Sequence, residues 1–379
     1  MSKYSPSSIE DVRAILEHQL AQLWAKPERA GSIAPLMLWG PPGIGKSTVV
    51  REVCTAKKIE FLDVRLAQRE PIDLRGLPVP NREGNGVDWL VSAEWPRDPA
   101  SRGVILFDEL TAADRTLQVA AYELILDRRL GTLYQVPPGW LLVAAGNRAS
   151  DRAVAGTMSS ALANRFCHLE VLPDLEEWVL WARANNVHPD VLGLLSTTPE
   201  LFFSMENVDV QRGWPSPRSW ERVGVVLDHA TELPERAVQR LIEGLIGPSA
   251  AAALTAFRTS ARELPNVPSL LDGDQPIRLP RRSDLRCALI SAIAYHLWRA
   301  PRREHAFQRL FEVLAALEDD FATLLVHETL RGRSEAEVRS FLLHPEYTRI
   351  QKRLGEKLRG RLTRASDAML RGVLIGLGA

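Results

Sequence analysis

Short apolar runs alternate with amphipathic stretches over the first 172 residues of the chain. Apolar runs bounded by turn-forming residues are typical of buried strands in a parallel sheet. Stretches with apolar residues every three or four positions indicate helices with one buried face. The predicted strands are residues 35–39, 60–64, 104–107, 141–145 and 168–171, and the predicted helices are residues 8–23, 46–57 and 112–128. This alternation predicts an α/β fold with a parallel sheet covered on both faces.

Two segments of this first part carry hairpin patterns. Residues 71–96 are rich in proline, glycine and asparagine, and we interpret them as a loop with a β-hairpin that pairs 76–80 with 87–91. A second hairpin is predicted from 131–134 to Trp140, with its return strand continuing into the apolar run that follows.

The pattern changes after residue 172, because nearly every later segment has helical periodicity. The sequence therefore predicts three parts: an α/β domain over 1–172, a helical region over 173–264, and a linker with a helical C-terminal region over 265–379. The linker, 265–283, is proline-rich and shows no periodicity. The predicted helices of the middle part are 175–185, 189–195, 218–229, 235–246 and 250–264.

The charge balance and the lack of long apolar runs narrow the functional classes. Lys plus Arg and Asp plus Glu each number 47, so the net charge is zero. A net charge of zero argues against a protein that coats nucleic acid and against a polybasic membrane anchor. A local basic patch is still compatible with a net charge of zero. No apolar stretch approaches the roughly 18 residues that span a bilayer. We expect a cytoplasmic protein without membrane insertion.

A phosphate-binding loop is the strongest chemical signal. The segment GPPGIGKS after the first apolar strand matches G-x-x-x-x-G-K-[ST] and opens the helix at 46–57. Its glycines let backbone N–H groups approach phosphate oxygens, the lysine supplies a mobile positive charge, and the serine hydroxyl can bind Mg²⁺. The predicted nucleotide-binding residues are Gly40, Pro41, Pro42, Gly43, Ile44, Gly45, Lys46, Ser47 and Thr48.

Polar side chains follow the next two buried strands. Asp108 and Glu109 end the run GVILFDE, and Asn147 ends LLVAAGN. At the carboxyl edge of a parallel sheet, Asp108 is placed to hold Mg²⁺ together with Ser47, and Glu109 to orient and deprotonate the attacking water. The Asn147 amide can position that water or contact a γ-phosphate without adding charge, and an Asx turn after the strand is the structural alternative.

In this order and spacing, the segments GPPGIGKS, ILFDE and AAGNR resemble those of an AAA+ ATPase. Further segments resemble the MoxR branch of the helix-2-insert group: PIDLRGLPVP with Val87, Asp88 and Trp89, LGTLYQVPPGW at 130–140, and ALANRF at 161–166. The resemblance covers roughly residues 30–230. It implies a P-loop AAA+ parallel sheet core with a helical lid at 173–264, and two hairpins that engage a remodelled client.

The resemblance also implies roles for three further side chains. Asn147 corresponds to sensor 1, Arg165 in ALANRF to the arginine finger that reaches the neighbouring subunit's nucleotide, and Arg218 in WPSPRSW to sensor 2. Arg212 and Arg222 compete with Arg218 for the last role. A finger that acts in trans implies a homo-oligomeric ring, and the family form is a hexamer. No N-K-x-D motif for guanine occurs in the sequence, so ATP with Mg²⁺ is the expected cofactor.

The resemblance implies an ATPase that remodels or activates a protein partner, and MoxR-like ATPases commonly work with a protein that bears a von Willebrand factor A domain. An alternative within the same fold is a nucleic-acid-linked motor of a restriction or defence system. Its support is the basic stretch Arg349, Lys352, Arg353, Lys357, Arg359, Arg361, Arg364 and Arg371, which also reads as a solvated helix face. A nucleotide-gated scaffold with little turnover is a third class, and the complete set Lys46, Asp108, Glu109 and Arg165 argues against it.

Overall fold

The computed structural model describes residues 5–148, 151, 158, 160–205 and 212–363. The chain divides into two compact units, Met1–Asp174 and Leu175–Ala379. The three-part division expected from the sequence stays a prediction.

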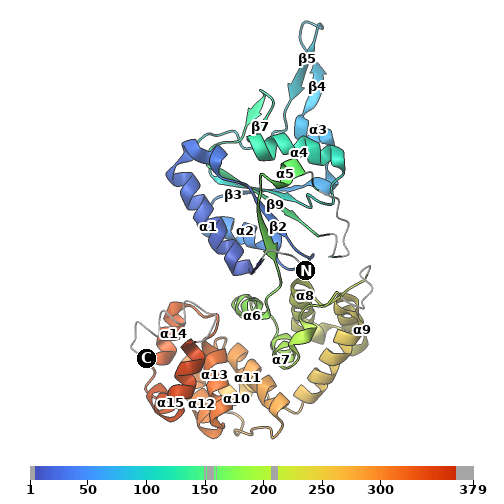
Figure 1. Cartoon of the computed structure of the whole chain (residues 1–379). Helices are drawn as coiled ribbons and strands as arrows, with labels where there is room; N and C mark the ends of the chain where they lie inside the picture. The colour runs from blue at the N-terminus through green and yellow to red at the C-terminus, as the bar shows by residue number, and fades with distance from the viewer. Residues whose placement is uncertain (1–4, 149–150, 152–157, 159, 206–211, 364–379) are drawn as a thin grey trace. The chain divides into compact units, whose positions relative to one another are not determined.

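A six-stranded parallel sheet forms the centre of the first unit (Figure 1). Its spatial order is β1-β10-β2-β9-β6-β3, so consecutive strands of the chain are separated in space by crossovers. The strands are β1 (Pro6–Ser7), β2 (Leu36–Trp39), β3 (Glu60–Arg65), β6 (Gly103–Asp108), β9 (Trp140–Gly146) and β10 (Cys167–Val171). The five strands predicted from the apolar runs are therefore present, and the predicted α/β fold is confirmed.

Helices cover both faces of this sheet, as expected for a parallel sheet that is buried on both sides. α1 (Ile9–Ala25) and α2 (Lys46–Lys57) pack against each other, and α2 packs on β3 and β6. α4 (Arg115–Asp127) shares a core with Ile105 and Phe107 of β6. α1 begins with a capping box, in which Ser8 and Asp11 bond each other's backbone N–H groups. The two-residue strand β1 before it is too short to give a sequence pattern.

The predicted first hairpin is present as β4 (Leu77–Pro80) paired with β5 (Val87–Leu90). Residues 71–75, which we interpreted as loop, instead form the short helix α3 (Pro71–Arg75). Proline at the first helical position and a capping box from Glu70 and Asp73 explain this turn of helix. Figure 1 shows the hairpin extending from the first unit beyond α3.

The second hairpin is shorter than predicted and pairs different residues. β7 (Arg129–Leu130) pairs with β8 (Tyr134–Gln135), whereas Trp140 begins the central strand β9. Pro137 and Pro138 have no N–H to continue a ladder, so they separate β8 from β9. The indole of Trp140 is buried and donates to the hydroxyl of Ser101 at 2.8 Å, which fixes it in the sheet.

The second unit consists of helices throughout its described part. They are α6 (Leu175–Ala184), α7 (Pro189–Thr197), α8 (Pro217–Asp228), α9 (Glu235–Ala261), α10 (Val267–Leu271), α11 (Ser283–Leu297), α12 (Arg303–Ala316), α13 (Asp319–Leu330), α14 (Glu335–Leu342) and α15 (Tyr347–Thr363). Gly247, with φ of 77°, breaks α9 between the two helices expected at 235–246 and 250–264. The expectation that 265–283 has no regular structure is wrong at α10, where Asn266 caps a turn that buries Val267, Leu270 and Leu271.

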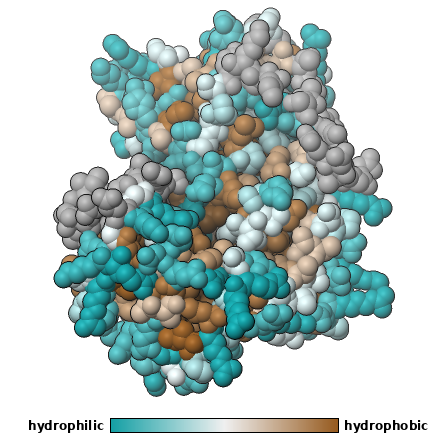
Figure 2. Space-filling model, turned by 60° about the horizontal axis from the view of Figure 1, so that its bottom comes forward, coloured by the Kyte–Doolittle hydropathy of each residue, from teal (hydrophilic) through white to brown (hydrophobic). Residues whose placement is uncertain are grey.

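Two apolar cores lie in this helical unit. One is built by α6, α7, α8 and α9, and the other by α10 to α15. α11 packs against α7 and so joins the two. Figure 2 shows apolar patches interspersed among hydrophilic groups on one face of the molecule. No helix in the described part of the chain is both long and apolar enough to cross a membrane.

Candidate active site

The phosphate-binding loop lies between the end of β2 and the start of α2. Gly43 and Gly45 have φ of 82° and 104°, a conformation that L side chains rarely adopt. Gly40 is required for a different reason, because a Cβ there would lie 2.5 Å from the carbonyl oxygen of Val171. The loop can therefore turn tightly beside β10 and direct backbone N–H groups to the N-terminus of α2, where an anion is stabilised.

Lys46 is buried and its ammonium group meets three oxygens of the loop and the neighbouring strand. Nζ donates to the carbonyl oxygens of Gly40 and Pro41 at 2.7 and 2.9 Å, and to Oδ1 of Asn147 at 3.3 Å. The structure thus brings Lys46 and Asn147 together although 101 residues separate them. A flexible ammonium held this way is a suitable partner for the β- and γ-phosphates of a nucleotide.

Ser47 and Asp108 form the second contact of the site. The hydroxyl of Ser47 donates to Oδ2 of Asp108 at 2.5 Å, so α2 and the end of β6 meet at these two side chains. Their donors are hard oxygens, which fit Mg²⁺ held by one or two protein groups together with phosphate oxygens and water. Among the described residues, no group of three or more His, Cys, Asp or Glu forms an all-protein metal site.

Glu109 follows directly and has an unusual backbone. Its φ is 57°, in the left-handed region, and its N–H donates to Oδ1 of Asp108 at 2.8 Å. The side chain is exposed, whereas that of Asp108 is half-buried. This conformation turns two consecutive carboxylates apart, so one faces Ser47 and the other reaches solvent beside the site.

Two residues that support this cluster could not be found from the sequence pattern. Thr111 is buried, and its Oγ1 accepts from the N–H of Asn147 and donates to its carbonyl oxygen, each at 3.1 Å. Arg148 donates to Oε2 of Glu170 at 3.0 Å and pairs with Asp151 at 3.2 Å. A threonine after a strand and an arginine after an asparagine are common, so only the three-dimensional contacts identify these roles.

Two predicted site residues belong to elements other than those that form this cluster. Arg165 is exposed on the turn that follows α5 (Ser160–Ala163). Arg218 belongs to the second unit, where it is exposed in the first turn of α8 after the capping residue Ser216. Its competitors Arg212 and Arg222 are exposed too. The roles of Arg165 and Arg218 stay predictions.

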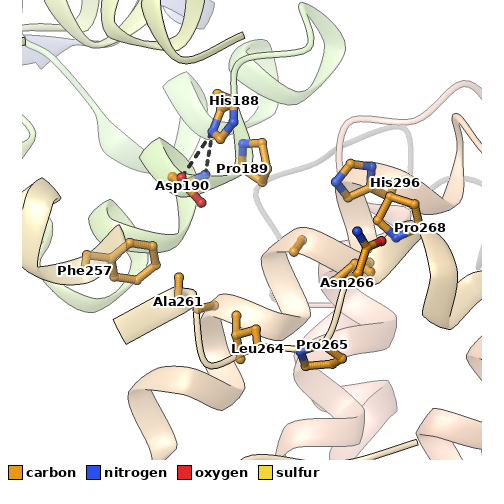
Figure 3. Close-up of a pocket in the computed structure, with 13 residues that line it drawn as sticks. His188, Pro189, Asp190, Phe257, Ala261, Leu264, Pro265, Asn266, Pro268 and His296 are labelled. Atoms are coloured by element: carbon orange, nitrogen blue, oxygen red, sulfur yellow. Dashed lines mark hydrogen bonds and ion pairs between the residues drawn. The ribbon is translucent and has the colours of Figure 1, made fainter. Parts of the chain in front are cut away.

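A separate pocket lies in the helical unit, lined by α7, α9, α10 and α11 with their connections (Figure 3). His188 accepts from the N–H of Asp190 and thereby caps α7, while Arg258 pairs with the Asp190 carboxylate at 3.1 Å. Burial lowers the pKa of His188, and burial beside Arg299 lowers the pKa of His296 to about 4. The Asp190 carboxylate at this pocket thus already has Arg258 as its ionic partner.

Comparison with known proteins agrees with this geometry. A family model described as AAA domain (dynein-related subfamily) matches residues 35–166, which include the loop, Asp108, Glu109, Asn147 and Arg165. No curated protein matches the chain.

Three solved structures resemble the chain at low identity. A candidate ATPase from Cytophaga hutchinsonii is 14% identical, with 67% of this chain and 95% of that chain covered and a TM-score of 0.30. The RuvB Holliday junction branch migration motor of Thermotoga maritima is 15% identical, with 81% and 91% covered and a TM-score of 0.36. NtrX from Brucella abortus is 17% identical, with 90% and 67% covered and a TM-score of 0.29.

The family match and the sheet topology lead to one conclusion. The match spans β2 to the end of α5 and contains the phosphate-binding loop, and the strand order places the ends of β2, β6 and β9 at one edge of a parallel sheet. Residues 35–166 match the family model of an AAA domain of the dynein-related subfamily, and the protein is an ATPase with the P-loop AAA+ fold.

Proposed function

We propose that the protein is a MoxR-like AAA+ ATPase that couples ATP hydrolysis to the remodelling or activation of a protein partner. The observation that carries this proposal is the hairpin β4–β5. Leu77, Val87, Trp89 and Leu90 have 50%, 58%, 45% and 59% of their surface exposed on it. Several large apolar side chains exposed together mark a surface that another molecule covers. Their place on the nucleotide-binding unit suits a client that is moved by hydrolysis.

We assign the site residues the following roles, which the contacts of Lys46, Ser47, Asp108 and Asn147 support. Residues 40–48 hold the phosphates, with Lys46 changing acceptors from loop carbonyls to phosphate oxygens. Ser47 and Asp108 hold Mg²⁺, which when bound neutralises charge on the phosphates. Glu109 orients the attacking water and takes its proton, and Asn147 positions that water from the next strand. Thr111 and Lys46 restrain Asn147 from two sides.

We propose that the active form is a homo-oligomeric ring, by expectation a hexamer, in the cytoplasm. Arg165 is exposed on a turn at the end of the AAA domain, which suits a guanidinium that reaches the neighbouring subunit's nucleotide. Such a finger raises turnover about 10³–10⁵-fold in other nucleotide hydrolases. Arg218, exposed at the start of α8, would contact the nucleotide as sensor 2. A protein with a von Willebrand factor A domain is the expected partner.

The described part of α15 does not favour the nucleic-acid alternative. Arg349 pairs with Glu346 at 2.9 Å, Arg353 with Asp319 at 3.4 Å, and Lys357 with Asp320 at 3.2 Å. The apolar side chains of the same helix, Ile350, Leu354 and Leu358, are buried in the core of this region. Three basic side chains of this stretch therefore have acidic partners within the protein. Arg364 and Arg371 lie outside the described residues.

The test is ATP turnover per chain against protein concentration, for the wild type and for Arg165→Ala. Turnover per chain of the wild type should rise with protein concentration. Arg165→Ala should bind ATP but should not hydrolyse it. Turnover that is flat with concentration and unaffected by the variant would contradict a shared site.

A second experiment measures ATP turnover after addition of a purified von Willebrand factor A domain protein, or of duplex DNA at low and moderate salt. Stimulation by the protein, lost in Trp89→Ser, supports the proposal. Salt-sensitive stimulation by DNA supports the alternative.

A further inference from the structure

Both ring nitrogens of His168 have partners in the first unit. The indole N–H of Trp39 lies 2.7 Å from Nδ1 of His168, and Nε2 lies 2.7 Å from the carbonyl oxygen of Ala163. An indole nitrogen only donates and a carbonyl oxygen only accepts, so Nδ1 must accept and Nε2 must carry the proton. The hydrogen-bond network thus selects one neutral tautomer of this imidazole.

The two bonds of His168 connect three elements of the first unit. Trp39 is the last residue of β2, directly before the phosphate-binding loop, and His168 lies on the adjacent strand β10. Ala163 is the last residue of α5. The rings of Trp39 and His168 are nearly parallel, with 16° between their planes. The imidazole therefore joins the strand that enters the nucleotide site to the end of α5.

The carbonyl oxygen of Ala163 also closes the turn that carries Arg165. It accepts from the N–H of Phe166 at 3.3 Å, in addition to its shorter bond from His168. After the turn, the N–H of Cys167 donates to the carbonyl oxygen of Pro35 at 2.9 Å, just before β2. The exposed Arg165 side chain is thus directed by a turn whose start is held by His168 and whose end is held by β10.

We propose that His168 is a positioning residue for Arg165: the Trp39–His168–Ala163 chain of hydrogen bonds fixes the turn that presents the guanidinium to the neighbouring subunit. This inference rests on the proposed action of Arg165 in trans. Since a displacement of about 1 Å at a catalytic group can cost about 10²-fold in rate, loss of the imidazole should reduce kcat strongly. The defect should appear in the neighbour's site and leave ATP binding by the altered subunit unchanged.

Two variants separate the two bonds of His168. In His168→Gln, the side-chain amide nitrogen can lie where Nε2 of the imidazole lies, so it can still donate to the carbonyl oxygen of Ala163. The shorter amide of His168→Asn can accept from Trp39 but does not reach Ala163. We expect His168→Asn to lower kcat at least 10-fold and His168→Gln to lower it less, with similar KM for ATP and similar unfolding temperatures. Equal losses in both, or a loss confined to KM, would overturn the inference.

Mixing subunits then tests whether the effect crosses to the neighbour. His168→Asn keeps its own hydrolytic residues, and Glu109→Gln keeps an intact finger, so a mixture of the two should turn over faster than the sum of the separate variants. The matched control mixes Arg165→Ala with Glu109→Gln, which should recover activity in the same way. A mixture of His168→Asn with Arg165→Ala should recover nothing, because neither subunit supplies a well-placed finger.

The outcomes distinguish the two proposals. Recovery in the control together with recovery for His168→Asn supports the inference. Recovery of turnover in the control alone means that His168 acts on the site of its own subunit. The inference then fails, whereas the proposed action of Arg165 in trans is supported. No recovery in the control overturns the action of Arg165 in trans, and the role of His168 falls with it.

Discussion

Thr111 holds Asn147 at both ends of its peptide unit: one hydroxyl accepts from the N–H and donates to the carbonyl oxygen, each at 3.1 Å. The approach is possible because Gly146 has no side chain, since a Cβ there would lie 2.8 Å from two atoms of Thr111. The end of β9 is thereby tied to the segment that follows Asp108 and Glu109. The segment that follows Glu109, the proposed water-activating residue, is thus joined through Thr111 to Asn147, the predicted sensor.

Replacing Thr111 with valine should remove the connection between the end of β9 and the segment that follows Glu109. Valine has nearly the same shape but no hydroxyl, so the N–H and carbonyl oxygen of Asn147 lose a buried partner. We expect a loss of about 1–3 kcal/mol in the free energy of unfolding and a lower kcat. Thr111→Ser keeps the hydroxyl and should retain most activity. Thermal unfolding and steady-state ATP turnover of both variants measure the difference, and equal behaviour of the two would contradict the role of the hydroxyl.

The backbone conformation of Glu109 should lower the free energy of unfolding relative to a protein with glycine at this position. Its φ of 57° costs an L residue about 1–2 kcal/mol relative to the right-handed region, and glycine avoids this cost. We therefore expect Glu109→Gly to be more stable than Glu109→Ala by about 1 kcal/mol, with both variants reduced at least 10²-fold in turnover. Urea unfolding of the two variants gives the comparison. A more stable alanine variant would show that the strain is absent.

The buried pair of Arg183 and Glu328 should show strong coupling. Both side chains are buried, and Arg183 donates to the carboxylate and to the carbonyl oxygen of Glu328. Arg183→Met should destabilise by about 3–5 kcal/mol, because it leaves the Glu328 carboxylate buried without this partner. The double variant with Glu328→Met should lose less than the sum of the single losses. Unfolding measurements on all four proteins complete the cycle, and additive losses would argue against the pair.

His327 should make the protein less stable in mild acid. Burial, together with Arg331, Arg361 and Arg183, lowers the pKa of His327 to about 3. Between the ordinary value of 6.5 and this pKa, the unfolded chain binds a proton that the folded chain does not, so stability falls as the pH falls. From pH 7 to pH 5 this one group should remove about 2 kcal/mol.

The matched variant for this prediction is His327→Gln, which is polar but does not titrate. Its free energy of unfolding should fall less between pH 7 and pH 5 than that of the wild type, by about the same 2 kcal/mol. His296, whose pKa is also lowered, remains in both proteins and contributes equally to each. Parallel pH dependences for the two proteins would mean that His327 is protonated in the folded state.

The sequence predicted those features that depend on local pattern. The helix Lys46–Lys57 was expected at the bounds it has, because the loop glycines and the apolar positions of the helix define both ends. The hairpin β4–β5 was expected because strand-forming residues flank a segment rich in turn-forming residues. α10 was missed because five residues are too few to show a helical period, and Pro268 suggested a linker.

Features that depend on strand order were not accessible from the sequence. Trp39 and His168 are 129 residues apart, and they meet only because β10 lies beside β2 in the sheet. Thr111 and Asn147 meet because β9 lies beside β6. A histidine within a strand or a threonine shortly after one has no distinctive local pattern. The proposed roles of Asn147, Arg165 and Arg218 come from family motifs.

The contacts between α6 and α13 limit how this protein can be shortened. A chain cut after residue 264 would leave the buried Arg183 without its partner Glu328 and would remove Arg331, the partner of the exposed Glu176. It would also remove α11 from the surface of α7. We therefore expect such a fragment to express poorly even though its AAA domain is intact. Helices α11 and α13 are then part of what α6 and α7 need in order to fold, and an exchange of modules between related ATPases would have to move all four helices together.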